Sequence, residues 1–251
     1  MNNYTYGLVS VSFRKNPPEE ILSAMKDASL SVIEWGSDIH APSDDLARLN
    51  ELCALQKKYG ISCSSYGTYF RIGVSEKSEI YAIIKAAEIL GTDVIRLWAG
   101  NLPSADVTGE LKEKLFLECK SLSEIAKDNG VKFCLECHNN TYTDDMDAAY
   151  ELISYVNSPN FKMYWQPNQF KTHEQNIACA KLLSPYTENI HVFNWEGKNK
   201  YPLIGAKDIW RDYLAQFGKD KTLLLEFMPD NSIQSLKAEA DSLRIITGER
   251  L

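Results

Sequence analysis

The sequence predicts one α/β domain over residues 1–251, a (β/α)8 barrel of the TIM type. Eight short apolar segments rich in β-branched and aromatic residues recur along the chain, as expected of buried strands. The segments between them carry apolar residues at helical spacing. Strand starts recur every ~25–40 residues, the length of one strand–loop–helix–loop unit. Eight such units account for the whole chain.

The predicted strands follow one another without a linker, a low-complexity stretch or a change in composition. They cover residues 6–13, 31–36, 61–67, 93–100, 131–138, 161–167, 189–195 and 221–228. The clearest helices are expected over residues 19–28, 79–90 and 109–130, the last ending on a glycine that suits a helix C-terminus. A doubly wound open sheet shows the same alternation. It usually has fewer strands, and no Gly-x-Gly-x-x-Gly motif follows the first strand here.

Composition and charge exclude some classes of function. The formal net charge is −7 and the pI is about 5.2, so a large nucleic-acid interface is not expected. No apolar run is long enough to cross a membrane, and the first residues do not resemble a signal peptide. We expect a cytoplasmic protein that binds a small molecule. Whether it forms a homo-oligomer is left open.

Active sites of such barrels form at the C-terminal ends of the strands, so polar residues that close an apolar strand are the candidates. In chain order the candidates are Glu34, His40, Arg96, Trp98, Glu136, His138, Gln166, Gln169, His191 and Glu226. Burying such groups without partners costs several kcal/mol each. We therefore expect them to contact one another, a metal ion or a ligand.

Four of these residues lie on the last four predicted strands and form a candidate metal site. Glu136, Gln166, His191 and Glu226 would offer three oxygen ligands and one nitrogen. This set suits Mn²⁺, Co²⁺ or Zn²⁺, and Mg²⁺ is less favoured because of the nitrogen. Without an ion, the two glutamates would repel each other across the mouth of the barrel.

The order and spacing of these motifs resemble those of the xylose isomerase-like barrel superfamily, the sugar phosphate isomerase/epimerase group. The resemblance covers nearly the whole chain and rests on the segments VIEWGSDIH, IRLWAG, LECHNNTYTDD, YWQPNQ, IHVFNW and LLEF. It implies a metal held by Glu136, Gln166, His191 and Glu226. Gln166 departs from the aspartate of the family's ketose 3-epimerases. Gln169 likewise stands where those enzymes have a substrate-binding histidine, and their strand-7 arginine has no clear counterpart.

The resemblance predicts a metal-dependent isomerase or epimerase acting on a sugar or sugar phosphate. Glu136 and Glu226 would exchange a proton at the carbon next to a carbonyl. The expected substrate-binding residues are His138, Arg96, Gln169, Glu34, His40 and Trp98, although an ion pair between Arg96 and Glu34 is an equally good interpretation.

Three alternatives follow from the same residues. A lyase on this barrel would abstract the same proton and then eliminate a hydroxyl group, as the dehydratases of the superfamily do. A sugar-binding barrel with a degraded metal site is the non-catalytic alternative, and Gln166 is the feature that favours it. The related abasic-site endonucleases need more metal ligands and a basic surface, so four histidines and an acidic pI argue against them.

Overall fold

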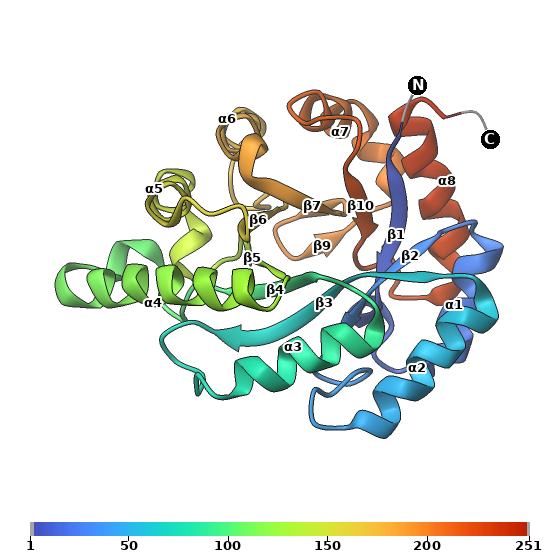
Figure 1. The fold of residues 1–251 in the computed structure, drawn as a ribbon. Coiled ribbons are helices and arrows are strands. Elements are labelled where there is room, and N and C mark those ends of the chain that lie inside the picture. Colours follow the sequence, from blue (N-terminus) through green and yellow to red (C-terminus); the bar gives the residue numbers. More distant parts are fainter. Residues whose placement is uncertain (1–2, 250–251) are drawn as a thin grey trace.

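Eight parallel strands close into a barrel in the computed structural model, which describes residues 3–249 (Figure 1). Each strand pairs with its sequence neighbour around the ring, and the last pairs with the first. The strands are β1 (Thr5–Val9), β2 (Val32–Gly36), β3 (Ser62–Arg71), β4 (Val94–Trp98), β5 (Lys132–Glu136), β6 (Phe161–Trp165), β7 (Thr187–Val192) and β10 (Thr222–Leu225). The single-domain TIM barrel expected from the sequence is confirmed.

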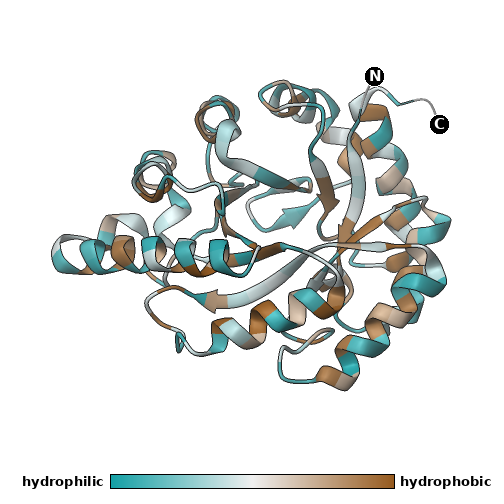
Figure 2. Ribbon diagram, viewed as in Figure 1, coloured by the Kyte–Doolittle hydropathy of each residue, from teal (hydrophilic) through white to brown (hydrophobic). Residues whose placement is uncertain are grey.

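Eight helices surround the barrel. They are α1 (Pro18–Asp27), α2 (Leu46–Tyr59), α3 (Glu79–Leu90), α4 (Gly109–Asp128), α5 (Met146–Val156), α6 (His173–Leu183), α7 (Lys207–Leu214) and α8 (Leu236–Thr247). Figure 2 shows these helices banded in polar and apolar residues, the pattern of helices that bury one face. None of the helices in the described part of the chain is long and apolar enough to cross a membrane.

Local sequence accounts for several helix ends. The side chains of Thr172 and Gln175 form a capping box that starts α6. Gly60 and Gly91 end α2 and α3 in the left-handed conformation, with φ of 70° and 83°. Glycine adopts this conformation without a Cβ clash, so the chain turns back toward the next strand directly after each helix.

The interior of the barrel changes from apolar to charged along its axis. Side chains two positions apart on a strand point to the same side of the sheet, so each strand contributes one residue to a lower layer and one to an upper layer. The pairs, lower residue first, are Val32 and Glu34, Val94 and Arg96, Cys134 and Glu136, Tyr164 and Gln166, Asn189 and His191, and Leu224 and Glu226. The lower layer, which is apolar except for Asn189 and the Tyr164 hydroxyl, therefore supports a polar layer at the C-terminal ends of the strands.

Some predicted strand bounds differ from the structure. The first strand ends at Val9, and Ser10–Phe13 form a 3-10 helix. The third strand continues to Arg71, four residues beyond the predicted end. The prediction also missed a two-stranded hairpin after β7, made of β8 (Trp195–Glu196) and β9 (Asn199–Lys200). Two-residue strands are too short to give a periodic pattern in sequence.

Candidate active site

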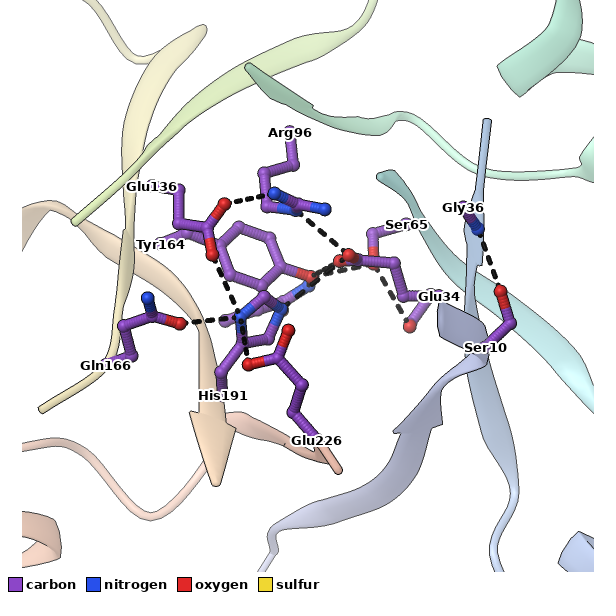
Figure 3. Close-up of polar contacts among 12 residues, drawn as sticks. Ser10, Glu34, Gly36, Ser65, Arg96, Glu136, Tyr164, Gln166, His191 and Glu226 are labelled. Carbon is purple, nitrogen blue, oxygen red and sulfur yellow. Dashed lines mark hydrogen bonds and ion pairs between the residues drawn. The ribbon is translucent and has the colours of Figure 1, made fainter. Parts of the chain in front are cut away.

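Polar side chains from six strands converge at the C-terminal end of the barrel (Figure 3). Glu136, His191 and Glu226 form a compact group in which one ligand atom from each lies within 4.8 Å of the others. His191 is at the centre of this group. Its Nδ1 lies 3.0 Å from Gln166 Oε1, 3.5 Å from Glu136 Oε1 and 3.7 Å from Glu226 Oε2. The four expected metal ligands thus meet around one nitrogen atom.

The other ring nitrogen of His191 faces Glu34. The Nε2 atom is buried and has no hydrogen-bond partner among the described residues, while Glu34 Oε1 is 3.6 Å away. Metal-binding histidines commonly direct their second nitrogen to a carboxylate, which fixes the ring and leaves the first nitrogen free for the ion. This arrangement leaves Nδ1 as the nitrogen that could bind a metal ion.

A buried ion-pair cluster, Glu34, Arg96 and Glu136, lies beside the histidine. Arg96 Nε donates to Glu34 Oε1 at 3.0 Å, and Arg96 Nη1 donates to Glu136 Oε2. Trp98 Nε1 donates to the same oxygen of Glu136. The second oxygen of Glu34 accepts hydrogen bonds from Ser65 Oγ at 2.9 Å and Tyr164 OH at 2.5 Å. Each carboxylate of the cluster is held by several donors.

Gly67 on β3 makes room for this cluster. A Cβ atom at this position would lie 2.4 Å from Glu34 Oε1 and 2.9 Å from Arg96 Nη2. Real Cβ atoms do not come this close to other heavy atoms, so any larger residue would displace the ion pair.

The two carboxylates of the candidate metal site have different electrostatic surroundings. Burial acts to raise the pKa of Glu136, but the charges of Arg96 and His191 outweigh it and hold that pKa well below its usual range. Burial raises the pKa of Glu226, and the negative charge of Glu136 raises it further. The charge of His191 lowers it, but by less, so the pKa of Glu226 lies above its usual value. Glu136 is therefore a fixed anion, and Glu226 is the carboxylate that takes up a proton more readily.

The site fits a divalent metal ion. Burial lowers the pKa of His191, but the charges and hydrogen bonds of Glu226, Glu136 and Glu34 raise it to about 10. In the protein without metal, a proton on His191 therefore sits among the carboxylates. With His191 neutral, three carboxylates and the Arg96 guanidinium leave a net charge of about −2, which a divalent ion would neutralise.

A pocket opens beside this group, with about 450 Å³ of empty space that includes part of the open solvent at its mouth. Its walls include five of the predicted site residues, namely Glu136, His138, Gln166, Gln169 and Glu226. They also include Asn139, Asn168, Phe193, Trp195 and Phe227. Among the pocket residues, Glu226 is distinctive because no described residue donates a hydrogen bond to its carboxylate. Its Oε2 lies 3.7 Å from His191 Nδ1.

The remaining predicted site residues do not line this pocket. Glu34 and Arg96 are buried in the ion-pair cluster. Trp98 stacks on His138 with ring centroids 4.6 Å apart and so forms a support behind the pocket wall. His40 lies elsewhere, with Nδ1 3.1 Å from Ser10 Oγ and Nε2 3.3 Å from the Asn16 carbonyl. It lines a separate groove beside α1.

The sequence analysis missed several residues of the site. Ser65 and Tyr164 bind Glu34 from the barrel interior. Phe227 follows Glu226 with a left-handed φ of 54°, unusual for an aromatic residue, and its N–H donates to Ser12 Oγ at 2.8 Å. This local strain fixes the direction in which the chain leaves the strand after Glu226. Aromatic and hydroxyl residues are common in strands, so only the alternation of inward positions could have indicated them.

The fold and the site define a TIM barrel with a group of residues that could hold a divalent metal ion, and comparison with known proteins gives its family. The chain belongs to the xylose isomerase-like TIM barrel family, whose model matches residues 22–237.

One curated relative and two solved structures of the same fold are similar to this chain. A 3-dehydroshikimate dehydratase of Bacillus anthracis is 32% identical over 197 residues, which are 70% of this chain and 69% of that protein. The crystal structure of a probable 3-DHS dehydratase from Bacillus anthracis superposes with a TM-score of 0.80 at 20% identity, covering 95% of this chain and 98% of that one. A xylose isomerase-like barrel protein from Mycobacterium smegmatis, solved in complex with magnesium, superposes with a TM-score of 0.73 at 14% identity, covering 98% and 97%.

Proposed function

We propose that the protein is a metal-dependent dehydratase, a lyase that removes water from a hydroxylated cyclic ketone such as 3-dehydroshikimate. The observation that carries the proposal is the 32% identity to a 3-dehydroshikimate dehydratase, combined with a Glu–His–Glu group at the wall of the pocket. The reaction begins with loss of a proton next to a carbonyl and ends with loss of a hydroxyl group.

The proposed metal ligands are Glu136, Gln166, His191 and Glu226. A divalent ion held by these residues would act as a Lewis acid toward the ketone oxygen of the substrate. The ion-pair cluster has a positioning role, because Arg96 and Trp98 fix the orientation of Glu136. Glu34 fixes the ring of His191 in turn.

Glu226 is the proposed base. Its carboxylate borders the pocket and accepts no hydrogen bond from the described residues, so its oxygen atoms are free to approach a substrate carbon. Glu136 is less suited to this role because Arg96 and Trp98 occupy one of its oxygens. The proton would move from the substrate to Glu226, and its electron pair would form the carbon–carbon double bond of the enolate.

His138 is the proposed acid for the departing hydroxyl. Its Nδ1 lies 2.7 Å from the Asn139 carbonyl, which can only accept a hydrogen bond, so Nδ1 carries a hydrogen and Nε2 remains for exchange with substrate. When the enolate collapses, the carbon–oxygen bond at the neighbouring carbon breaks and His138 protonates the leaving group, which departs as water. The resulting cyclic dienone loses a proton from its ring CH2 group to solvent and gains one on the ketone oxygen, which gives the aromatic product. Transfer of a proton from Glu226 back to His138 through solvent restores the starting state.

The sugar isomerase or epimerase predicted from the sequence shares the first step of this reaction. An epimerase would return the proton to the same carbon from the opposite face, whereas a dehydratase expels a hydroxyl group. The dehydratase relative favours the second outcome. We therefore propose the lyase, which the sequence analysis gave as an alternative, in place of the isomerase or epimerase.

The experiment that tests the proposal uses the purified protein stripped of metal with a chelator. Mn²⁺, Co²⁺, Zn²⁺ and Mg²⁺ are added back separately, and 3-dehydroshikimate is supplied as substrate. We expect near-ultraviolet absorbance from the aromatic dihydroxybenzoate product, and its loss on renewed chelation. A parallel panel of ketoses in deuterated water tests the isomerase. Deuterium incorporation without any dehydration would establish that activity instead, and the absence of both would support a non-catalytic sugar-binding barrel.

A further inference from the structure

Lys200 stands above two aromatic rings of the pocket. It lies on β9, directly opposite Trp195 in the register of the hairpin. Its Nζ is 5.2 Å from the centre of the Trp195 ring and 4.5 Å from that of Phe227. Both rings also line the pocket that contains Glu136. The hairpin therefore brings a cation to the mouth of the pocket.

No carboxylate within residues 3–249 forms an ion pair with the Lys200 ammonium group, although the Glu226 carboxylate is close enough to act on its charge. The one hydrogen bond of its ammonium group goes to the neutral side-chain amide of Asn231, with Nζ 2.6 Å from Oδ1. An ammonium group has three hydrogens to donate, so donors remain available. Burial lowers the pKa of Lys200, and the nearby Glu226 carboxylate opposes this effect. A partly desolvated cation that lacks an anion is a good binding group for one.

The other cations close to the site are already engaged. Arg96 is buried between Glu34 and Glu136. Arg71 stacks on Trp98 with its guanidinium carbon 4.0 Å from the ring centre, and it donates to the Gly100 carbonyl at 3.0 Å.

We propose that Lys200 binds the carboxylate of the substrate and thereby selects carboxylated cyclic ketones over neutral sugars. This inference rests on the proposed dehydratase function, and it adds a substrate-binding residue that the strand-end pattern did not indicate. A carboxylate beneath Lys200 would lie against the Trp195 and Phe227 rings, so the ring of the substrate would extend from the mouth of the pocket toward Glu226.

Two measurements test this proposal, namely ligand affinity by calorimetry and the rate of dehydration. The ligands are 3,4-dihydroxybenzoate and its methyl ester, which differ in the negative charge. We expect wild type to prefer the acid, and Lys200→Met to lose about 10- to 100-fold in affinity for the acid, the range of a hydrogen bond to a charged group. Affinity for the ester should be unchanged. Lys200→Arg should restore part of the preference.

Lys198→Met is the matched control, because Lys198 is an exposed lysine on the same hairpin and its removal changes the net charge equally. It should bind both ligands as wild type does. Equal losses for acid and ester in Lys200→Met would show that the Asn231 contact only supports the hairpin, and would overturn the proposal. So would the absence of any preference for the acid in wild type.

The measurement separates this inference from the proposed function. If wild type fails to dehydrate 3-dehydroshikimate but prefers the acid through Lys200, the reaction is wrong and the anion site stands. If it dehydrates 3-dehydroshikimate and Lys200→Met has the same kcat/KM as wild type, the reaction stands and the role of Lys200 is wrong.

Discussion

The two sides of the barrel mouth are built differently. On the side of β2, β4 and β5, the ion-pair cluster of Glu34, Arg96 and Glu136 is buried, and each charge has partners. On the side of β10 and the hairpin, Glu226 and Lys200 carry charges with few protein contacts. Glu226 lines the pocket, and Lys200 lies over the Trp195 and Phe227 rings of its wall. His191 lies between the two sides and contacts Glu34, Glu136 and Glu226.

This difference suggests that the paired side holds the site in shape and that the other side takes part in the proposed reaction. Charges that are fully paired inside a barrel hold a fixed geometry, and removing one leaves its partner buried and uncompensated. Charges that lack protein partners are free to exchange protons or to bind a ligand. Substitutions on the first side should therefore affect stability together with activity, and those on the second side should affect activity alone.

The largest effect is expected for Glu226→Gln. It removes the proposed base but breaks no hydrogen bond to the carboxylate among the described residues, so kcat for dehydration should fall about 10²- to 10⁴-fold at an unchanged melting temperature. Glu136→Gln is the comparison: it should lose activity and also melt at a lower temperature, because Arg96 loses a buried partner. Similar melting temperatures for the two variants would contradict the division of the site into two sides.

Arg96→Met should have the largest effect on stability. It leaves Glu34 and Glu136 buried without their common cation, so the free energy of unfolding should fall by about 3–5 kcal/mol in urea titrations. Lys85→Met is the control, because Lys85 pairs with Glu88 on the exposed face of α3 and its loss should change little. A stable Arg96→Met protein would show that the cluster is not needed for folding.

Metal binding should release a proton. The carboxylates raise the pKa of His191 to about 10, and the ion must displace the proton from Nδ1. Metal affinity should therefore rise about tenfold per pH unit between pH 7 and 9 and level off above pH 10. Calorimetry in buffers of different ionisation enthalpy counts the released protons directly. Proton release of zero at pH 7 would show that the metal does not bind His191.

The smallest effect is expected for Gln166→Glu, which adds a charge at the neutral side chain among the proposed metal ligands without changing its length. Because the Gln166 Oε1 position is 3.0 Å from His191 Nδ1, a carboxylate there should tighten metal binding by about tenfold. The gain is limited because the Gln166 amide also donates to the Cys137 carbonyl at 3.0 Å, and glutamate loses that bond. Unchanged metal affinity would indicate that residue 166 does not ligate the ion.

Much of the fold and part of the site could be predicted from the sequence. The alternation of apolar strands and amphipathic helices indicated the barrel, and the expected helix over residues 79–90 coincides with α3. The search for polar residues at strand ends correctly placed Glu136, Gln166, His191 and Glu226 together. They meet because the C-terminal ends of parallel strands lie at the same end of the barrel. The same search could not distinguish residues that line the pocket from residues buried beneath it, because both kinds lie at the end of an apolar strand.

The sequence by itself determined which side chains reach the barrel mouth, because strand periodicity is a local property of the backbone. Only the tertiary structure decided how these side chains pair. Arg96 could have faced a substrate, but the space left by Gly67 lets it join Glu34 and Glu136. Lys200 sits above the pocket because a short hairpin turns back over Phe227, a residue 27 positions along the chain. Such contacts depend on closing the barrel, which no local pattern encodes.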